Sequence, residues 1–283
     1  MESRASQNRT KSLAVGVLLT GLVASAGLYA GEGWVKDPIN ECAIWSDRLE
    51  AKEIFSWSGA CLDGKASGEG VLVVFKDVRL VLRYTGTMET GKAQGVGKVE
   101  YHTDAGYVKY WGQLKDSTLQ GQGFLLRPDG GLYAGELKKD EPNGRGTYTA
   151  ANGSSYQGMF VDGKPQGTGS DRGAAGGGEY FGHYAKGRRH GQGMVTYEDG
   201  ARYLGEFKAG EPDGSGRWEG PKGDVYEGEF RAGHAEGRGK YTAENGDVVE
   251  GSFVANLPDG TVQVTKADGT QEQQVWKDRM QAQ

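Results

Sequence analysis

One spacing of glycines and aromatic residues recurs through most of the chain and limits what the chain can fold into. Aligned on an aromatic residue with glycine two positions later, the copies read Y-x-G-x-[FLY]-x-x-G-x-x-x-G-x-G-x-x-x-Y. From Tyr133 to Tyr226 the copies start 23 or 24 residues apart. A fixed period of this length predicts a stack of small structural units in place of one conventional globular core. The copies start at Trp57, Tyr84, Tyr110, Tyr133, Tyr156, Tyr180, Tyr203 and Tyr226, and a degenerate ninth starts at Val249.

The composition agrees with a thin, repeated structure. Glycine accounts for 50 of 283 residues, whereas hydrophobic residues reach only 36% and aromatic residues 10%. The aliphatic content is too low for a thick core, and the aromatic content is too high for a disordered linker. The absence of a Gly-X-Y period excludes collagen. A net charge of −5, with no basic excess, makes nucleic acid a poor candidate partner.

The repeat has the pattern of a β-hairpin. Tyr, Gly and Phe or Leu at positions i, i+2 and i+4 face one side of a strand. The glycine in the middle of each repeat is expected in a chain reversal with positive φ, and the following Asp-Gly or Asn-Gly pairs are predicted to be tight type I′ turns. We therefore predict an all-β fold, an elongated single-layer antiparallel sheet of stacked hairpins. The mid-repeat glycines are Gly163, Gly187, Gly210 and Gly233, and the predicted type I′ turns are Asp129-Gly130, Asn152-Gly153, Asp199-Gly200 and Asn245-Gly246.

This repeat resembles the MORN (membrane occupation and recognition nexus) repeat, and the resemblance covers about three quarters of the chain. It implies the same elongated sheet. In MORN-containing enzymes the activity resides in a separate attached domain, and no span of domain size is left for one here. The third copy departs from the pattern at Ser117, which replaces a turn glycine, and the fifth runs into the glycine-rich segment 173–178.

The resulting domain plan has four parts: residues 1–30 form a signal peptide or membrane anchor, 31–56 an N-terminal cap, 57–262 the repeats and 263–283 a C-terminal cap. Both ends need a cap because open sheet edges pair with other chains. A short helix is expected in the C-terminal cap, with Trp276 and Met280 on one face.

The first 30 residues have the pattern of an export signal. Three basic residues precede an uncharged, largely apolar run over 12–30, where we expect a short helix. Ala24-Ser25-Ala26 offers a cleavage site, but the run is also long enough to remain as a membrane anchor. Either alternative places the rest of the chain outside the cytoplasm, in the periplasm or secreted, or anchored in the inner membrane. In such an oxidising compartment Cys42 and Cys61 are a disulfide candidate, and two unpaired buried thiols are the alternative.

The sequence offers no catalytic, metal-binding or cofactor-binding motif. The four histidines are scattered and none belongs to an H-E-x-x-H pattern. The recurrent G-x-G pairs open strands and lack the context of a phosphate loop. A G-x-S-x-G nucleophile elbow is also absent. We therefore predict a protein that is not an enzyme and takes no cofactor or metal.

These observations predict a non-enzymatic scaffold or protein-binding module in the cell envelope, with self-association as a further expectation. The alternative is a peripheral module that binds membrane lipid or cell-wall glycan. Binding to a protein partner is assigned to the repeat tyrosines Tyr133, Tyr156, Tyr180, Tyr203 and Tyr226. Contact with anionic lipid is assigned to a basic edge formed by Lys138, Lys139, Arg188 and Arg189.

Overall fold

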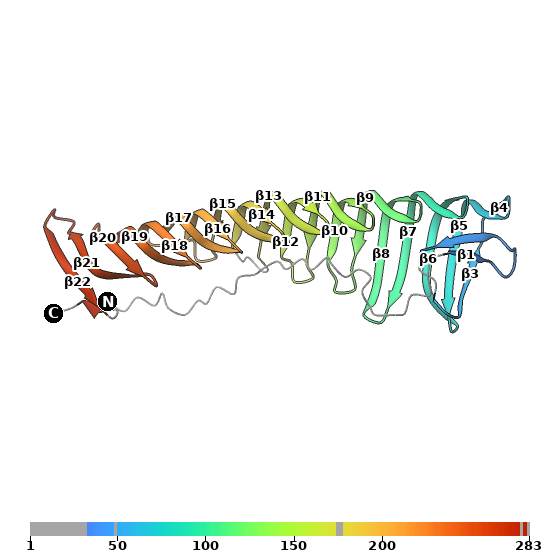
Figure 1. The fold of residues 1–283 in the computed structure, drawn as a ribbon, viewed down its shortest axis with the longest axis horizontal. Coiled ribbons are helices and arrows are strands. Elements are labelled where there is room, and N and C mark those ends of the chain that lie inside the picture. Colours follow the sequence, from blue (N-terminus) through green and yellow to red (C-terminus); the bar gives the residue numbers. More distant parts are fainter. Residues whose placement is uncertain (1–32, 48–49, 174–177, 278–279, 282–283) are drawn as a thin grey trace. The chain divides into compact units, whose positions relative to one another are not determined.

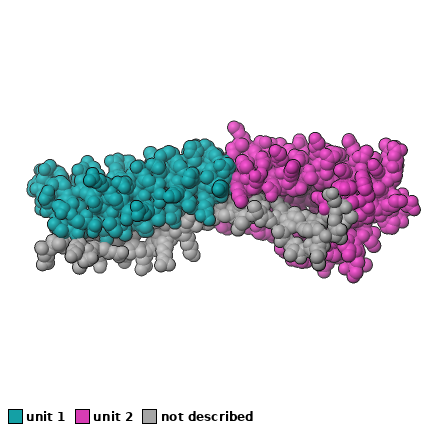
Figure 2. Space-filling view, viewed as in Figure 1, with its two compact units in different colours: residues 1–16, 165–283 teal, residues 17–164 magenta. Residues whose placement is uncertain are grey.

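A computed structural model describes residues 33–47, 50–173, 178–277 and 280–281. These residues form strands and turns without any helix, so the part of the chain that is described contains no helix able to cross a membrane. The apolar segment 12–30 and its predicted helix lie outside the described residues. The described chain divides into two compact units, which we call the N-terminal unit, up to Lys164, and the C-terminal unit, from Pro165 onward (Figure 2).

In the N-terminal unit β1 pairs with β2, and β2, β3 and β4 each pair with β5, β2 in parallel and the others antiparallel (Figure 1). From β5 to β12 each strand pairs with the next one along the chain. Its strands are β1 (Gly33–Lys36), β2 (Ala43–Ser46), β3 (Glu53–Trp57), β4 (Ala60–Leu62), β5 (Lys65–Lys76), β6 (Arg79–Glu89), β7 (Lys92–Thr103), β8 (Gly106–Lys115), β9 (Thr118–Leu126), β10 (Leu132–Lys138), β11 (Glu141–Thr149) and β12 (Ser155–Val161).

The C-terminal unit is also built of consecutive pairs, since every strand from β13 to β22 pairs antiparallel with its successor. The predicted all-β fold of antiparallel hairpins is therefore confirmed. The strands are β13 (Lys164–Arg172), β14 (Glu179–Ala185), β15 (Arg188–Thr196), β16 (Arg202–Lys208), β17 (Glu211–Glu219), β18 (Val225–Arg231), β19 (His234–Thr242), β20 (Val248–Val254), β21 (Leu257–Thr265), β22 (Gln271–Lys277) and β23 (Met280–Gln281).

One face of each sheet, which we call the inner face, holds the core. Along β16 burial alternates strictly, with Tyr203, Gly205 and Phe207 buried and their neighbours exposed. The Tyr203 ring meets the rings of Phe207 and Phe230 edge-on, with centroids 5.2 and 4.9 Å apart. Because Phe230 belongs to the next hairpin, the rings connect consecutive repeats, and each hairpin stabilises its neighbour.

The paired glycines make room for the tyrosine ring. A Cβ added at Gly182 or Gly193 would lie 2.3 to 2.6 Å from atoms of the Tyr180 side chain. The ring therefore lies flat over two strands of its own repeat, and its hydroxyl donates a hydrogen bond to the His183 carbonyl at 2.9 Å. Any side chain at these two glycines would displace the ring from the core.

The structure places the type I′ turns at the mid-repeat glycines and not, as predicted, at the Asp-Gly and Asn-Gly pairs. The mid-repeat glycines have positive φ as expected, but so do the residues before them, for example Lys186 at 53° and Ala209 at 55°. Positive φ at both central residues is the type I′ geometry, so the type I′ turns lie at the mid-repeat reversals. The Asp-Gly and Asn-Gly pairs form longer loops, as at Asp199-Gly200, where only Gly200 has positive φ and the Asp199 carboxylate accepts the Ala201 N–H.

The reversals also join successive hairpins. The Gly187 amide donates to the Pro165 carbonyl at 2.9 Å, and Gly210 donates to the Arg189 carbonyl at 3.0 Å. Since each bond crosses from one repeat to the preceding one, the turns stack in register and fix the spacing between hairpins.

The N-terminal end of the sheet is covered by the segment before the repeats. Cys42 is fully buried and forms a disulfide with Cys61, with Cα atoms 5.7 Å apart. The buried Asp37 carboxylate accepts the Trp57 N–H at 2.8 Å, and the Asn40 amide donates to the Trp57 carbonyl at 2.9 Å. Side chains thus satisfy the backbone of β3 at Trp57, where a further strand would otherwise pair.

At the other end the predicted C-terminal helix is wrong. Residues 271–277 form β22, which pairs with β21 from Gly260↔Trp276 to Thr265↔Gln271. The helical spacing of Trp276 and Met280 is overridden because β21 offers a row of backbone partners that an isolated segment lacks.

Candidate interaction surface

The five tyrosines predicted to form a binding surface belong to the core. Tyr133, Tyr156, Tyr180, Tyr203 and Tyr226 are all at most 4% exposed. Each hydroxyl donates to the backbone carbonyl three residues later, at 2.7 to 3.2 Å. Burial raises the pKa of Tyr180 and Tyr226 to about 12. The alternation of the strand was predicted correctly, but the tyrosine side is the packed side, so a partner cannot reach these rings.

The predicted basic edge is only partly available. Lys138 and Arg188 are exposed at the ends of their strands, and Lys139 is exposed in the turn that follows β10. Arg189 instead turns toward the core and donates two hydrogen bonds to Asp171, Nε to Oδ2 at 2.9 Å and Nη2 to Oδ1 at 2.5 Å. Arg189 turns inward because the buried Asp171 carboxylate needs a counter-charge.

Asp171, Arg189 and Tyr184 form one buried polar cluster. The Tyr184 hydroxyl donates to the Asp171 carboxylate, and the Arg189 guanidinium lies 4.6 Å from the centre of the Tyr180 ring. Burial and the Asp171 charge raise the pKa of Tyr184. Other repeats place proline where Arg189 stands and phenylalanine where Tyr184 stands, as at Pro212 and Phe207. Asp171, from the copy that starts at Tyr156, and Tyr184 and Arg189, from the next copy, are thus departures in two adjacent copies that compensate one another.

The opposite side of each sheet, the outer face, is formed by residues that the repeat pattern leaves unspecified. The residue after the tyrosine pairs across the hairpin with the residue after the second G-x-G glycine. Trp111 pairs with Phe124 in this way, Phe181 with Met194, and Glu227 with Lys240. These positions form the central row of the outer face.

In the N-terminal unit this row carries a concentrated apolar patch. Trp111 and Phe124 are 54% and 52% exposed, and their rings stack with centroids 5.8 Å apart. Leu126, two residues beyond Phe124 on the same side of β9, pairs with Leu132 of β10, and both leucines are exposed. We call these four residues the β8–β10 patch. Large apolar side chains gathered at exposed positions mark an interaction site more often than single ones do.

Basic side chains border the β8–β10 patch. Lys98 stands directly opposite Trp111 on β7 and has no ion-pair partner among the described residues. Lys109 lies two residues before Trp111 on β8 and pairs with Glu100 at 3.4 Å. Glu100 on β7 lies between Lys109 on β8 and Arg83 on β6, which is its register partner. On its β6–β8 side the border therefore holds three cations and one anion, and on its β10 side it holds Glu136, the register partner of Gln122.

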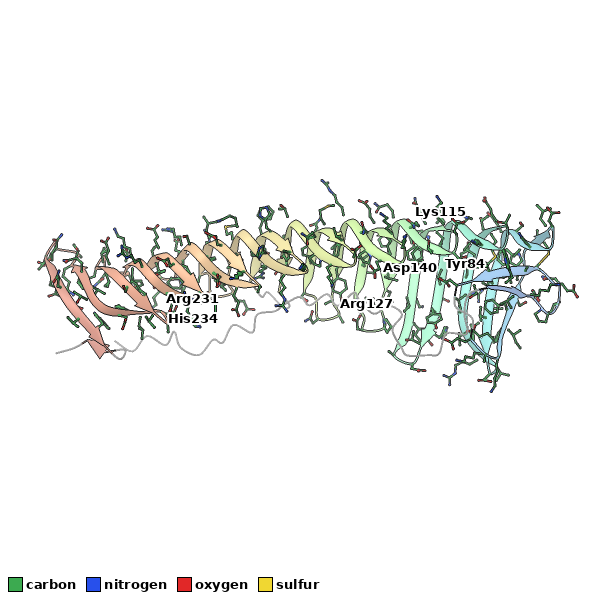
Figure 3. The ribbon with its side chains drawn as sticks, viewed as in Figure 1. Tyr84, Lys115, Arg127, Asp140, Arg231 and His234 are labelled. Atoms are coloured by element: carbon green, nitrogen blue, oxygen red, sulfur yellow. A yellow bond between two sulfur atoms is a disulfide. The ribbon has the colours of Figure 1, made fainter. Side chains whose placement is uncertain are left out.

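The C-terminal unit presents a different outer face. Phe181, Met194 and Leu204 form an exposed apolar row on β14, β15 and β16. Beyond them the row becomes charged, with Arg217 paired to Glu227 at 2.9 Å and Lys240 to Glu250 at 3.1 Å. At the start of β19, the His234 side chain contacts that of Asn256, in the turn region where Arg231 and His234 are labelled (Figure 3).

The histidine and acidic side chains of the described residues are scattered over the sheets. Within the described ranges no group of three or more His, Cys, Asp or Glu side chains could hold a metal ion. The four histidines come from separate strands, β7, β14, β15 and β19. What each unit does offer is an outer sheet face whose side chains differ in polarity and charge from one hairpin to another.

The β8–β10 patch was not predicted from the sequence, because the predicted binding residues were all taken from the recurring positions and the basic turn residues of the repeat. The available signal was the opposite one, namely tryptophan and phenylalanine at variable positions where most other copies place small or polar residues, with Phe181, Met194 and Leu204 as exceptions. In a repeat whose recurring residues fill the core, a large apolar residue at a variable position has no packing role.

Comparison with known families supports the repeat assignment. The model of the MORN repeat matches residues 133–155, 156–170, 180–202, 203–225 and 226–248. No curated protein sequence matches the chain at a significant level. Among solved structures, the TCP domain of SAS-4 (dCPAP) of Drosophila melanogaster, in complex with a proline-rich motif of Ana2 (dSTIL), aligns with 11% identity and a TM-score of 0.35. That alignment covers 62% of this chain and 88% of that one, and the assignment rests on the family match alone.

Proposed function

Since this chain is a MORN-repeat protein, with MORN repeats across residues 133–248, we propose that it is a non-enzymatic scaffold of the cell envelope that binds a protein partner. MORN repeats are modules that bind proteins or membranes, and the repeat family is not itself catalytic. The observation that carries the choice of a protein partner is the β8–β10 patch. Its stacked Trp111 and Phe124 rings are exposed without any role in the core.

The envelope assignment is supported by two features of the chain. The uncharged segment 12–30 follows three basic residues, as in export signals. The disulfide between Cys42 and Cys61 suits an oxidising compartment. In the envelope, such a scaffold would have the N-terminal edge of its sheet covered by the segment before the repeats and would bind its partner through the outer face.

Binding to anionic lipid or wall glycan is the second candidate. Exposed Lys138 and Lys139 lie at the β10–β11 turn and favour contact with an anionic surface. Acidic neighbours weaken that attraction, because Asp140 and Glu141 follow directly in sequence. We therefore place this function after protein binding.

Site-specific photo-crosslinking in the native host tests the proposal. A photoreactive phenylalanine analogue would replace Phe124 in one variant and Val275 in a control variant, because Val275 is equally exposed on the outer side of β22. Mass spectrometry would identify the adducts and also the N-terminal peptide of the mature chain.

The proposal predicts one dominant protein adduct from position 124 and none from position 275. It further predicts that the chain fractionates with envelope proteins. Adducts confined to lipid or wall material would favour the second candidate, and a cytoplasmic chain would refute the envelope assignment.

A further inference from the structure

We propose that the β8–β10 patch binds one amphipathic α-helix whose apolar stripe is flanked by acidic residues. This inference rests on the proposed function and specifies the partner that the site accepts. Three properties of the patch lead to it: the spacing of its side chains, the charge of its border and its area.

The spacing fits a helix laid across the strands. Trp111 and Phe124 stand on neighbouring strands, as do Leu126 and Leu132, so each row advances by one strand, about 4.8 Å. A helix repeats its apolar face about every 5.4 Å, so successive turns meet successive strands. An extended segment repeats its face about every 6.8 Å and falls out of step with the rows.

The charge of the border selects acidic flanks. Lys98 lies directly across from Trp111, and Lys109 lies across from Leu126. Among the described residues on the β7 and β8 side of the patch, the one acidic side chain is Glu100, which Lys109 already engages at 3.4 Å. A helix with glutamate or aspartate beside its apolar stripe would complete the pairing that Lys98 lacks among the described residues.

The area argues against a second copy of the chain as the occupant. Two half-exposed aromatic rings and two partly exposed leucines offer about 300 to 400 Å². A stable dimer buries about 800 Å² on each partner. Two copies facing each other here would also place Lys98 and Lys109 against their own counterparts. A short helix needs no more than the available area and brings the opposite charge.

The C-terminal unit provides the matched control. Phe181 and Met194 occupy the same repeat positions as Trp111 and Phe124, and they are similarly exposed. Their neighbours on the row are Ser170 and Leu204, with no lysine opposite Phe181. If apolar exposure alone were sufficient, both places would bind the same peptide.

The test uses the full chain and synthetic 18-residue helices with a fluorescein label, followed by fluorescence anisotropy. One peptide has a leucine stripe flanked by glutamate, a second has the same stripe flanked by lysine, and a third has the first composition in scrambled order. Variants W111S/F124S and K98E probe the patch, and F181S/M194S is the control. Urea unfolding curves check that all variants keep the stability of the parent chain.

We expect the glutamate-flanked helix to bind at least tenfold more tightly than the lysine-flanked or scrambled peptide. W111S/F124S should weaken binding at least tenfold, K98E should reduce the preference for glutamate at least threefold, and F181S/M194S should change affinity less than twofold. Equal binding of the three peptides, or equal losses in the patch and control variants, would overturn the inference.

Sedimentation with vesicles containing 30% phosphatidylglycerol separates the membrane alternative. Vesicle binding that W111S/F124S abolishes, without any helix binding, would assign the patch to a lipid surface and refute the helix. If photo-crosslinking at position 124 captures a protein but no helix binds, the inference fails while the proposed function stands. If position 124 captures only lipid, the proposed function fails as well.

Discussion

The hairpins β8–β9 and β18–β19 have the same kind of inner face but differ in the residues on their outer faces. Inside, Tyr110 and Tyr226 are both buried, and each donates its hydroxyl to the carbonyl three residues later, at 2.7 and 3.2 Å. Outside, the central pair is the stacked Trp111 and Phe124 in one hairpin and Glu227 and Lys240 in the other.

This difference shows how the repeat separates folding from recognition. The inner positions are constrained because a ring must fit over two glycines, whereas the outer positions face solvent and can change at little cost in stability. Each hairpin can therefore present different chemistry on one scaffold. Changes to the inner face should therefore cost the most stability, and changes to the outer face the least.

Alkaline pH should destabilise the sheet through the ionisation of the buried tyrosines on its inner face. Burial raises the pKa of Tyr84, Tyr110 and Tyr180 to about 12, so the folded chain keeps these phenols protonated above their ordinary pKa of 10.0. In the unfolded chain they ionise near pH 10. Their contribution to stability is thus fully present below about pH 10 and is lost as the pH rises to about 12.

The measurement is tyrosinate absorbance recorded together with circular dichroism between pH 9 and 12.5. Ionisation of the buried phenols should coincide with loss of the sheet signal. Complete ionisation near pH 10 with the sheet intact would contradict the burial of these rings.

Adjacent residues on one strand should differ sharply in their effect on stability. Tyr203→Ala removes a ring that is 1% exposed and should lower the free energy of unfolding by about 3 to 5 kcal/mol. Leu204→Ala removes a side chain that is 58% exposed and should change it by about 0.5 kcal/mol or less. Urea unfolding of both variants makes the comparison, and similar losses would refute the assignment of the two faces.

Arg188 and Arg189 provide the same comparison for charged side chains. Arg189→Leu leaves the buried Asp171 carboxylate without its counter-charge and should cost about 2 to 4 kcal/mol, because the Arg189 side chain is 21% exposed. Arg188→Leu should cost about 0.5 kcal/mol or less. Thermal or urea unfolding measures both variants.

A triple variant checks the cause of that loss. Asp171→Val, Tyr184→Phe and Arg189→Pro together restore residues that other repeats use at these positions. The triple variant should recover most of the stability lost by Arg189→Leu, because no buried charge is left unpaired. A triple variant as unstable as the single one would show that the cluster is not the source.

The smallest effect is expected on the charged part of the outer face. Arg217 donates to Glu227 and Glu219 at 2.9 and 3.1 Å, but all three side chains are largely exposed to water. Arg217→Ala should therefore lower the free energy of unfolding by less than about 1 kcal/mol, and the loss should shrink further in 0.5 M salt. A larger loss that persists in salt would mean that the outer face contributes to folding.

Much of the fold could be predicted from the period and the alternation of the sequence. Tyr, Gly and Phe at alternate positions required a strand with one uniform face, and the mid-repeat glycines required a reversal. The type I′ turns were assigned to the wrong pairs because Lys186 and Ala209 hold positive φ without being residues that favour it. The register of the stacked hairpins imposes that conformation, and register is not visible in a four-residue segment.

The candidate site could not be predicted in the same way. The alternation of the sequence assigns the tyrosine positions and the variable positions to opposite faces of the strand. It does not show which of the two faces is buried, because both contain large apolar residues. The buried face is the tyrosine face, because only there do paired glycines leave room for a ring to lie over the backbone. The ion pair of Arg189 was missed for a related reason, since Asp171 lies 18 residues away and only the pairing of β13, β14 and β15 brings them together.

Hydroxyl-radical footprinting of neighbouring residues is the most direct test of the two-face account. Oxidation rates would be measured for the pairs Tyr110 and Trp111, and Tyr180 and Phe181, each normalised to the rate in the urea-unfolded chain. The account predicts that Trp111 and Phe181 keep about half of their unfolded rates, while Tyr110 and Tyr180 fall at least tenfold below theirs. Equal protection within each pair would contradict an inner face that folds and an outer face that is free to bind.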